Sequence, residues 1–384
     1  MTAICMMTRM MTTRTIKEQY YCSQKFWWLT VEPERRSMTS CCAASTQKID
    51  LDWLRNNPGQ LFNDPNLLHE RQQMLDNKPP SSCEDSCWQA ERIGLPSLRT
   101  LMKSDIKTHL DIVSSPTVLH INLGSDCNLT CSYCCKQYST AWLRDIDKNG
   151  AYLDDPRFHI NNNDRIVLKL GQKKVKSSES YELIINEIKK IKTVNRIEIS
   201  GGEPLLYNDL DQLVQSLSGP INIYTGLGVD SKRLKRILDT LPETITFSIS
   251  AENTGKLYEF NRYGNTWNNF LTNLDLVLQK FDYKFAMVLS NLTIHGMEDF
   301  RKNVGTSKDT MNYCNDPIYL SASVLDPESK TMYQHTLPDL STTISNAYSP
   351  QQKQNLKNYI HYFVKNRNLD LNIFPKHFIS WMNQ

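Results

Sequence analysis

Four cysteines lie within nine positions of the segment GSDCNLTCSYCCKQY, residues 124–138: Cys127, Cys131, Cys134 and Cys135. Four thiolates can close around a structural zinc ion, whose ligands usually come as two short pairs separated by a longer spacer. The spacing here is different, because Cys134 and Cys135 are adjacent and neighbouring side chains rarely point at one ion. The pattern Cys127-x3-Cys131-x2-Cys134 favours a [4Fe–4S] cluster that leaves one iron without a protein ligand.

The cysteine loop follows a predicted strand. The β-branched and apolar segment TVLHINLG ends just before Cys127, and downstream short apolar segments alternate with helical patterns. This alternation predicts βα units on a parallel sheet with right-handed crossovers. Six strands are too few for a closed eight-stranded barrel, so the expected fold is α/β, a partial (β/α)6 TIM-like barrel with its site at the C-terminal strand ends. The predicted strands are 117–124, 196–200, 221–225, 244–250, 284–290 and a last strand within 317–325.

Helices are predicted between and after these strands. Apolar residues recur at helical spacing in SESYELIINEIKKIKTV (178–194), with Ser177 or Ser178 as the N-cap. By contrast, residues 144–176 are polar, rich in Asn and Asp, and poor in apolar residues, which predicts an insertion or lid rather than core. Further helices are expected at 208–217, 231–241, 266–281 and 350–369.

Two motifs, each at the end of a predicted strand, make the sequence resemble the radical SAM family. The segment CNLTCSYC, Cys127 to Cys134, matches the family's CxxxCxxC signature, and the aromatic Tyr133 before the last cysteine is typical of it. The segment ISGGEPLLY (199–207) matches the GGEP segment at the end of the family's second barrel strand. Alone, the first motif could be a zinc knuckle and the second a plain turn, but together and in this order they are specific.

The resemblance implies a cofactor and a reaction. Cys127, Cys131 and Cys134 would bind a [4Fe–4S] cluster whose open iron is chelated by the amino and carboxylate groups of S-adenosylmethionine (SAM). Donation of one electron would cleave SAM to a 5′-deoxyadenosyl radical, which abstracts hydrogen from a substrate, while the protein positions the cofactor. No further catalytic residue is assigned.

The same resemblance implies which residues contact SAM. Gly201 and Gly202 would let the backbone approach the methionine moiety closely, and Glu203 would accept from its ammonium group. Arg262 stands where relatives often place an arginine against the SAM carboxylate, although a solvated surface arginine is the alternative. The remaining positions that the resemblance assigns to the cofactor are Pro204, Ser248, Ser250 and Glu252.

A second group of cysteines precedes residue 90. Residues 22–99 are similar to the SPASM-like or twitch modules that bind an auxiliary [4Fe–4S] cluster, in the version placed before the barrel that is common in bacteriophage and environmental sequences. The run C-x3-C-x3-E-x2-G-x2-S-x-R, ending at Arg99, fits that version. The cysteines that match the order of ligands in these modules are Cys22, Cys41, Cys83 and Cys87.

The nature of this second site stays open on sequence alone. Four thiolates would leave no open iron, so a cluster there would serve electron transfer or structure. They would also suit a structural zinc ion, and unligated cysteines could be buried small hydrophobes. Spacing does not decide between Cys41 and Cys42, although Cys41 lies where relatives usually place the ligand.

Composition limits the classes of function. The chain has 384 residues, and 44 basic against 41 acidic residues give no electrostatic reason to expect nucleic acid as a partner. No apolar run approaches the roughly 20 residues of a membrane helix, and no secretory signal is present, so a reducing, cytoplasmic location is expected. The expected parts are a leader (1–19), the cysteine-rich module (20–105), the barrel (115–330) and a C-terminal helical extension (331–384).

The sequence therefore predicts a radical SAM enzyme with an auxiliary cluster. Its substrate would be a small molecule or a peptide, with carbinol dehydrogenation and peptide modification as the two reactions in view, and its electron donor a flavodoxin or ferredoxin. The alternative from another class is a catalytically inactive zinc-binding scaffold protein. Colour and metal content distinguish the two, because iron–sulfur protein is brown and zinc protein colourless.

Overall fold

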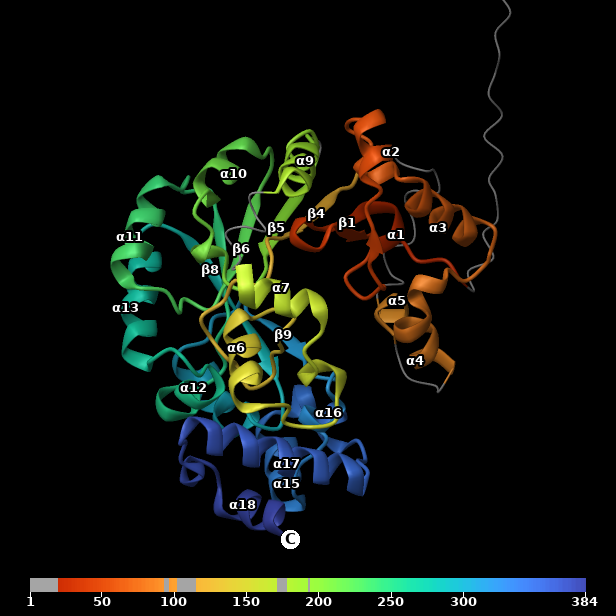
Figure 1. Cartoon of the computed structure of the whole chain (residues 1–384). Helices are drawn as coiled ribbons and strands as arrows, with labels where there is room; N and C mark the ends of the chain where they lie inside the picture. The colour runs from red at the N-terminus through yellow and green to blue at the C-terminus, as the bar shows by residue number, and fades with distance from the viewer. Residues whose placement is uncertain (1–19, 93–96, 102–114, 171–177, 193) are drawn as a thin grey trace, which may run out of the picture. The chain divides into compact units, whose positions relative to one another are not determined.

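The computed structural model describes residues 20–384 except 93–96, 102–114, 171–177 and 193 (Figure 1). The chain divides into two compact units, one made of residues 1–30 and 38–116 and the other of residues 31–37 and 117–384. The predicted leader and the alternative cap Ser177 lie outside the described residues. Each unit is described separately.

The larger unit is built on six parallel strands that are neighbours in chain order. This arrangement confirms the predicted α/β fold with a parallel sheet, and the first five strands lie within or close to the predicted ranges. The strands are β4 (Val118–Asn122), β5 (Arg196–Ser200), β6 (Ile221–Thr225), β7 (Thr246–Ile249), β8 (Asp282–Leu289) and β9 (Thr310–Tyr313).

Helices connect these strands, and local sequence sets their ends. The Ser178 side chain caps the helix that follows it by accepting from Tyr181 N, and Asp230 caps another by accepting from two backbone N–H groups. Figure 1 shows the helices α10 and α11, in green, and α13, in teal, along the outside of the strands. The connecting helices are α6 (Thr140–Asn149), α7 (Asn162–Leu170), α9 (Glu179–Ile188), α10 (Leu210–Ser216), α11 (Ser231–Thr240), α12 (Gly255–Asn261), α13 (Trp267–Leu278) and α14 (Met297–Asn303).

The two faces of this sheet differ in polarity. Side chains alternate along each strand, and one face is apolar and fully buried, as at Ile121, Ile199 and Phe247. The opposite face, here called the inner face, is polar. It carries the in-register residues His120, Glu198 and Asn222 of β4 to β6 and Ser200, Tyr224, Ser248 and Lys284 of β5 to β8.

One strand prediction was wrong. The sixth strand is β9, where Thr310 pairs with Ala286 of β8, and no strand forms in 317–325, which contains the short 3-10 helix η9 (Ile318–Leu320). Here the Asn291 side chain donates to the carbonyls of Tyr319 and Val324, at 2.8 and 3.2 Å. The residues of 317–325 therefore form an irregular segment, whose backbone groups bond to each other in turns and to Asn291 rather than to a strand partner.

The interpretation of 144–176 as lacking core residues was also wrong. Tyr152 and Phe158 are only 2% and 5% exposed, and their rings stack with centroids 5.3 Å apart. Both rings also lie against Trp142 of α6. Few residues of this segment are apolar, but aromatic rings bury a large area each, so two of them suffice to join the core.

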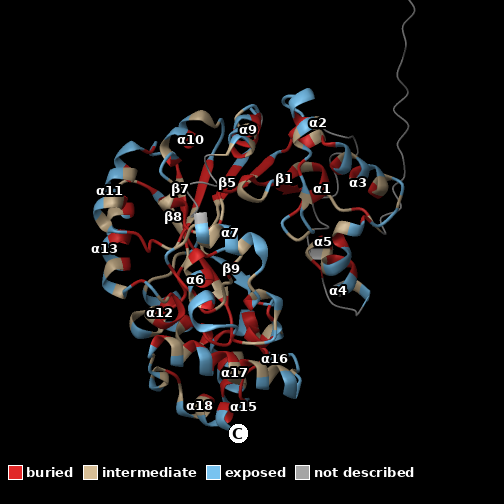
Figure 2. Ribbon diagram, in the orientation of Figure 1, coloured by how far each residue is buried: buried red, intermediate tan, exposed pale blue. Residues whose placement is uncertain are grey.

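The C-terminal residues belong to the same unit as the sheet. The predicted helix at 350–369 is confirmed as α17 (Pro350–Arg367), which begins at a capping box in which Ser349 and Gln352 bond each other's backbone N–H groups. Figure 2 shows buried residues along this helix on one side and exposed residues on the other. The other helices of this region are α15 (Pro327–Thr336), α16 (Ser341–Ser345) and α18 (Lys376–Asn383).

The smaller unit consists of short elements around its own core. That core contains Tyr21, Phe26, Met74, Cys83, Cys87 and Trp88. Strands β1 (Trp28–Glu32) and β2 (Ser37–Thr39) span the chain positions at which the two units divide. The other elements are α1 (Gln24–Trp27), β3 (Gln47–Lys48), α2 (Leu51–Asn56), α3 (Pro65–Leu75), η3 (Ser81–Cys83), the π-helical turn η4 (Glu84–Trp88), α4 (Gln89–Arg92) and α5 (Leu98–Leu101).

Among the helices that the structure describes, none combines the length and the hydropathy needed to cross a bilayer.

Candidate functional site

The cysteine loop after β4 and the GGEP segment after β5 are joined through their backbones. Gly202 N donates to Gly124 O and Glu203 N to Asp126 O, both at 2.7 Å. A Cβ on Gly202 would lie 2.3 Å from Asp126 O, and one on Gly201, whose φ is +136°, would lie 2.9 Å from Gly124 O. The paired glycines therefore let the two strand-end loops touch, which makes the two motifs parts of one site.

A carboxylate from the short 3-10 helix η1 (Pro33–Arg35) secures the start of the cysteine loop. Glu34 accepts from Ser125 N at 3.1 Å and from Ser125 Oγ at 2.9 Å. Gly124 has φ of +127°, and a Cβ there would lie 1.8 Å from the Glu34 carboxylate. Sequence reasoning missed Glu34, because the residues it contacts are 91 positions away.

The three predicted cluster thiols lie within electrostatic range of one another. Burial, the Cys131 thiolate and Glu203 raise the pKa of Cys127 to about 12. Burial raises the pKa of Cys134 well above its usual value, and the charges of Cys135, Cys131 and Cys127 add to this shift. These shifts belong to the protein without a bound metal, because a metal would stabilise the thiolates instead.

Cys135 lies in different electrostatic surroundings. Burial raises its pKa, and the charged side chains that lower it are Arg157 and Arg35. Cys135 is also the charged group with the largest effect on the pKa of Cys134. The spacing of the cysteines, rather than their pKa values, therefore favours Cys127, Cys131 and Cys134 as the ligands of one site.

The donor set suits an iron–sulfur cluster better than a closed zinc site. Within the described parts of the chain, no three His, Cys, Asp or Glu side chains already hold the positions of metal ligands. The group consists of three thiols, and three thiolates with one position left open are the ligand set of a cluster that binds a further ligand. A structural zinc ion would need a fourth protein ligand.

A buried ion pair lies against the middle cysteine of this group. Arg262 Nη2 is 2.9 Å from Glu252 Oε2, and Arg262 Nη1 is 3.8 Å from Cys131 Sγ. The Tyr133 hydroxyl donates to the other oxygen of Glu252 at 2.9 Å, and the guanidinium lies over the Tyr133 ring. Arg262 is 5% exposed and Glu252 is 1% exposed, so the alternative of a solvated surface arginine is excluded.

This arginine remains charged and keeps an unused donor. Burial opposes its charge, but Glu252, then Tyr133 and Cys131, raise the pKa of Arg262 well above its usual value. Its buried Nε has no hydrogen-bond partner among the described residues. A buried N–H without a partner costs free energy, so a ligand that accepts from it would be favoured at this point.

Glu203 is held by three donors of its own chain. Its Oε1 accepts from the Thr225 hydroxyl at 2.7 Å and from Leu205 N at 3.2 Å, and its Oε2 accepts from Gly226 N at 2.9 Å. Burial raises the pKa of Glu203, and these donors and Arg262 counteract the shift. Since a carboxylate oxygen can accept two hydrogen bonds, Oε2 can take one more donor.

The other residues that the resemblance assigned to SAM lie in varied places. Ser248 is fully buried on the inner face, and its hydroxyl donates to Asn222 Oδ1 at 3.0 Å. Ser250 is partly exposed just after β7, and its N–H donates to Thr225 O. Pro204 is buried in the turn η7 (Pro204–Leu206). The structure therefore groups Gly201, Gly202, Glu203, Glu252 and Arg262 with the cysteine loop, whereas Ser248 is engaged within the sheet.

In the smaller unit, the four predicted cysteines also influence one another. Burial raises the pKa of Cys22 to about 12, with further contributions from the charges of Cys41, Cys83 and Cys87. Cys41 is 5% exposed and is among the thiols that raise the pKa of Cys22, whereas Cys42 is exposed. The surroundings therefore favour Cys41 over Cys42 as the partner of the other three.

A buried lysine adds positive charge beside these thiols. Lys25 is fully buried, and its Nζ lies 2.7 Å from Glu70 Oε2 and 2.9 Å from Ser82 Oγ. Burial raises the pKa of Cys83 to about 11, against the effect of the Lys25 ammonium, which lowers it. A cation in this place stabilises thiolate over thiol.

Arg99 connects the first cysteine segment to the last cysteine pair. Its Nη1 donates to Tyr21 O, next to Cys22, at 3.2 Å, and its guanidinium lies over the ring of Trp88, next to Cys87. Glu91 orients it by accepting from Arg99 Nε at 3.0 Å, and the Ser97 hydroxyl donates to the same carboxylate. The Glu, Ser and Arg of the run ending at Arg99 are thus one hydrogen-bonded group, which we call the Arg99 pin (Glu91, Ser97 and Arg99).

Comparison with known proteins agrees with the geometry of the larger unit. Residues 121–304 match the family model described as the radical SAM superfamily. A GTP 3′,8-cyclase from Aquifex aeolicus (strain VF5) is 27% identical over 222 residues, which cover 53% of this chain and 59% of that protein. The chain therefore spans less than two thirds of this relative.

Solved structures give weaker likenesses. The structure of native anSMEcpe with bound AdoMet and Cp18Cys peptide has a TM-score of 0.35 and 17% identity, with 58% of this chain and 59% of that chain covered. SuiB from Streptococcus suis bound to S-adenosylmethionine has a TM-score of 0.32 and 14% identity, with 93% and 70% covered. At these scores the solved structures carry no argument about this chain.

Proposed function

We propose that this chain, whose residues 121–304 match the radical SAM superfamily, is an enzyme that cleaves SAM at a [4Fe–4S] cluster bound by Cys127, Cys131 and Cys134. The observation that carries the proposal is the pair of backbone hydrogen bonds from the GGEP segment to the cysteine loop. These bonds unite two independent motifs in one site at the C-terminal ends of parallel strands, where α/β barrels place their chemistry.

The residues of the site supply ligands and orientation. When bound, the cluster would supply the electron that cleaves SAM and so generates a 5′-deoxyadenosyl radical for hydrogen abstraction. The free acceptor position on Glu203 Oε2 would receive the SAM ammonium group. The unpartnered Nε of Arg262 would donate to the SAM carboxylate, while Glu252 holds the guanidinium in place.

We further propose an auxiliary [4Fe–4S] cluster bound by Cys22, Cys41, Cys83 and Cys87. The mutual effects of these four thiols and the buried Lys25 charge beside them support a site for a thiolate-ligated group. Four protein ligands leave no open iron, so this cluster would transfer electrons or stabilise the unit. The Arg99 pin would hold the segment of Cys22 against the segment of Cys87.

Replacement of Arg99 by glutamine should lower the occupancy of the auxiliary site. The change removes the hydrogen bonds that Arg99 donates to Glu91 and to Tyr21 O, and a hydrogen bond to a charged group contributes about 1.5–3 kcal/mol. We expect the iron content of anaerobically reconstituted protein to fall from about eight toward about four per chain. The matched control is Arg92→Gln, which breaks the exposed Arg92–Glu84 pair in the same segment and should leave the iron content unchanged. Equal iron in wild-type and Arg99→Gln protein would contradict the role of the pin.

The substrate is proposed as a class only. A small molecule and a peptide both fit a radical generated at the strand ends, and the polar inner face favours a substrate with hydrogen-bonding groups. The Aquifex relative is a GTP cyclase by name, which is consistent with the small-molecule class. A flavodoxin or ferredoxin would supply the electron. We place the protein in the cytoplasm, because its thiols must stay reduced to bind iron.

Anaerobic purification tests the proposal directly. Reconstituted, dithionite-reduced protein with SAM should release 5′-deoxyadenosine and methionine, and it should carry about eight irons and eight sulfides per chain. A colourless protein with stoichiometric zinc and no SAM cleavage would contradict the proposal and favour the zinc-binding scaffold. Oxygen must be excluded throughout, because exposed thiolates and cluster irons are oxidised in air.

A further inference from the structure

One face of α17 contacts the backbone of the cysteine loop. The Tyr359 hydroxyl donates to Ser132 O at 2.5 Å, and Arg367 Nε donates to Thr130 Oγ1 at 3.2 Å. These contacts join residues 227 and 237 positions apart, and they flank Cys131 on both sides. Tyr359 and Arg367 are 2% and 8% exposed, so water does not compete for these hydrogen bonds.

Arg367 is itself fixed by several partners. Its Nη1 donates to the Tyr152 hydroxyl at 2.5 Å, and its Nη2 lies 3.3 Å from Asp145 of α6. Its guanidinium also lies over the rings of Phe363 and Trp142. A guanidinium held on so many sides offers Thr130 a rigid donor.

The opposite side of the loop is held as well. Thr130 N donates to Tyr263 O and Ser132 N to Asn261 O, both at 2.9 Å. Between these two positions, Cys131 O accepts from Trp142 Nε1 at 3.0 Å. The backbone around Cys131 is therefore held from the end of α12 and from Trp142, and α17 adds hydrogen bonds to Ser132 O and to the Thr130 hydroxyl. Together these bonds leave the direction of the Cys131 side chain little freedom.

We propose that α17 is a positioning element of the cluster site, in which Tyr359 and Arg367 hold the cysteine loop in the conformation that presents Cys131 to the cluster. This inference rests on the proposed function. It assigns a role to α17, which lies outside both the cysteine motif and the GGEP motif. The helix restrains the ligand-bearing loop before any cofactor binds. Metal ligands are commonly oriented in this way by the residues around them.

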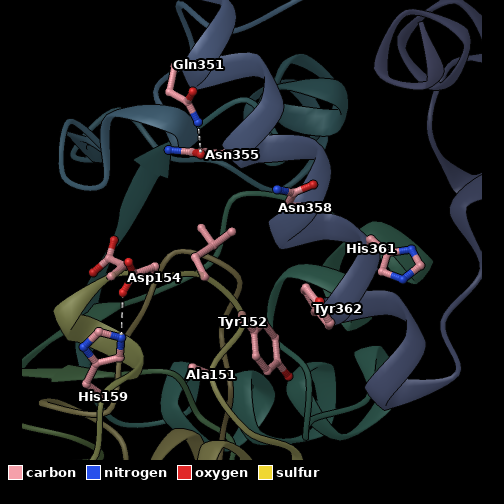
Figure 3. Close-up of a pocket in the computed structure, with 11 residues that line it drawn as sticks. Ala151, Tyr152, Asp154, His159, Gln351, Asn355, Asn358, His361 and Tyr362 are labelled. Carbon is pink, nitrogen blue, oxygen red and sulfur yellow. Dashed lines mark hydrogen bonds and ion pairs between the residues drawn. The ribbon is translucent and has the colours of Figure 1, made fainter.

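The outward side of the same helix provides a matched control. It borders an open, polar cavity of about 790 Å³, whose other wall is the segment from Ala151 to His159 (Figure 3). Tyr362 lies on this side, one turn from Tyr359, and is 41% exposed. Its hydroxyl makes no contact with the cysteine loop, so Tyr362→Phe changes the same residue type in the same helix without touching the restraint.

Hydrogen exchange of the cofactor-free full-length chain tests the restraint. In Tyr359→Phe, Ser132 O loses its donor, so the amides of Thr130 and Ser132 should exchange about tenfold faster than in wild type, the factor that corresponds to about 1.4 kcal/mol. Arg367→Met, which keeps most of the apolar stacking, should accelerate the amide of Thr130. Tyr362→Phe should leave both rates unchanged, and the thermal unfolding midpoint shows whether each variant is folded.

Iron release from the reconstituted protein supplies the second measurement. Tyr359→Phe should lose iron to a chelator several-fold faster than wild type and Tyr362→Phe. Unchanged exchange and unchanged iron release in folded Tyr359→Phe and Arg367→Met would overturn the positioning role while leaving the proposed function intact. If wild-type protein binds no cluster, the proposed function fails, and the exchange rates alone then show whether α17 restrains the loop.

Discussion

Replacement of Cys131 by alanine should abolish SAM cleavage and remove about four of about eight irons per chain. A cluster with three protein thiolates loses one third of them in this variant, and the vacant position faces the Arg262 guanidinium, whose Nη1 is 3.8 Å from Cys131 Sγ. The Glu252 carboxylate, which acts on Cys131, is already paired with Arg262 at 2.9 Å. Iron and sulfide analysis, together with chromatography of 5′-deoxyadenosine and methionine after dithionite reduction, measures the outcome.

Cys135→Ala is the matched control for this variant, because it removes a thiol from the same loop. Cys135 lies outside the Cys127-x3-Cys131-x2-Cys134 spacing, and the charged groups that lower its pKa are Arg157 and Arg35. We expect this variant to keep its iron and its SAM cleavage. Equal losses in Cys131→Ala and Cys135→Ala would contradict a three-thiolate cluster and favour a four-thiolate metal site.

The second large effect is expected in the smaller unit. The double variant Cys83→Ala/Cys87→Ala should lose about four irons per chain and still form 5′-deoxyadenosine from SAM. Both cysteines are nearly fully buried in the core of their own unit, and neither takes part in the contacts that hold the loop of Cys131. Iron counting, electron paramagnetic resonance of the reduced protein and the SAM cleavage assay together separate the two sites.

Cys42→Ala provides the comparison for this double variant. Its side chain is exposed, whereas Cys41 is buried and raises the pKa of Cys22. The exposed thiol should therefore be dispensable for iron binding. Retention of all the iron in the double variant would show that the smaller unit holds no cluster, and loss of zinc in place of iron would identify a structural zinc site.

The sequence predicted the parts of the site that depend on local pattern. The spacing of Cys127, Cys131 and Cys134 and the glycines of GGEP are short-range features, and the alternation of strands and helices predicted that they meet at one end of a parallel sheet. The structure adds that Gly201 and Gly202 face the cysteine loop itself. The sequence analysis expected these glycines to let the backbone approach the methionine moiety of SAM. In the structure, the segment that they approach is the cysteine loop.

The partners of the site residues could not be predicted in the same way. Tyr133 and Glu252 are 119 positions apart, and Tyr359 and Ser132 are 227 apart, so no periodicity or spacing links them. Side-chain hydrogen bonds between distant segments are decided by packing of the folded chain. The cysteine loop could thus be recognised from its own residues, but the side chains that restrain it could not.

The two corrected predictions have the same physical origin. Secondary-structure propensity and apolar content are properties of a segment by itself, whereas its conformation in the protein also depends on the residues that it contacts in the folded chain. Residues 317–325 have strand-like composition, yet their backbone bonds within turns, and the Asn291 side chain donates to the carbonyls of Tyr319 and Val324. Residues 144–176 have few apolar side chains, yet Tyr152 and Phe158 reach the aromatic residues of α6.

The polarity of the inner face has a consequence for how such a protein can evolve. The apolar face, with Ile121, Ile199 and Phe247 fully buried, supplies the packing free energy of the sheet. The inner face contributes polar groups such as Tyr224 and Lys284, which stay partly accessible to solvent. Folding stability and the shape of the inner surface therefore depend on opposite sides of the same strands. Substitutions on the inner surface can change which molecule binds there with little loss of folding stability. The same fold can therefore acquire new substrates.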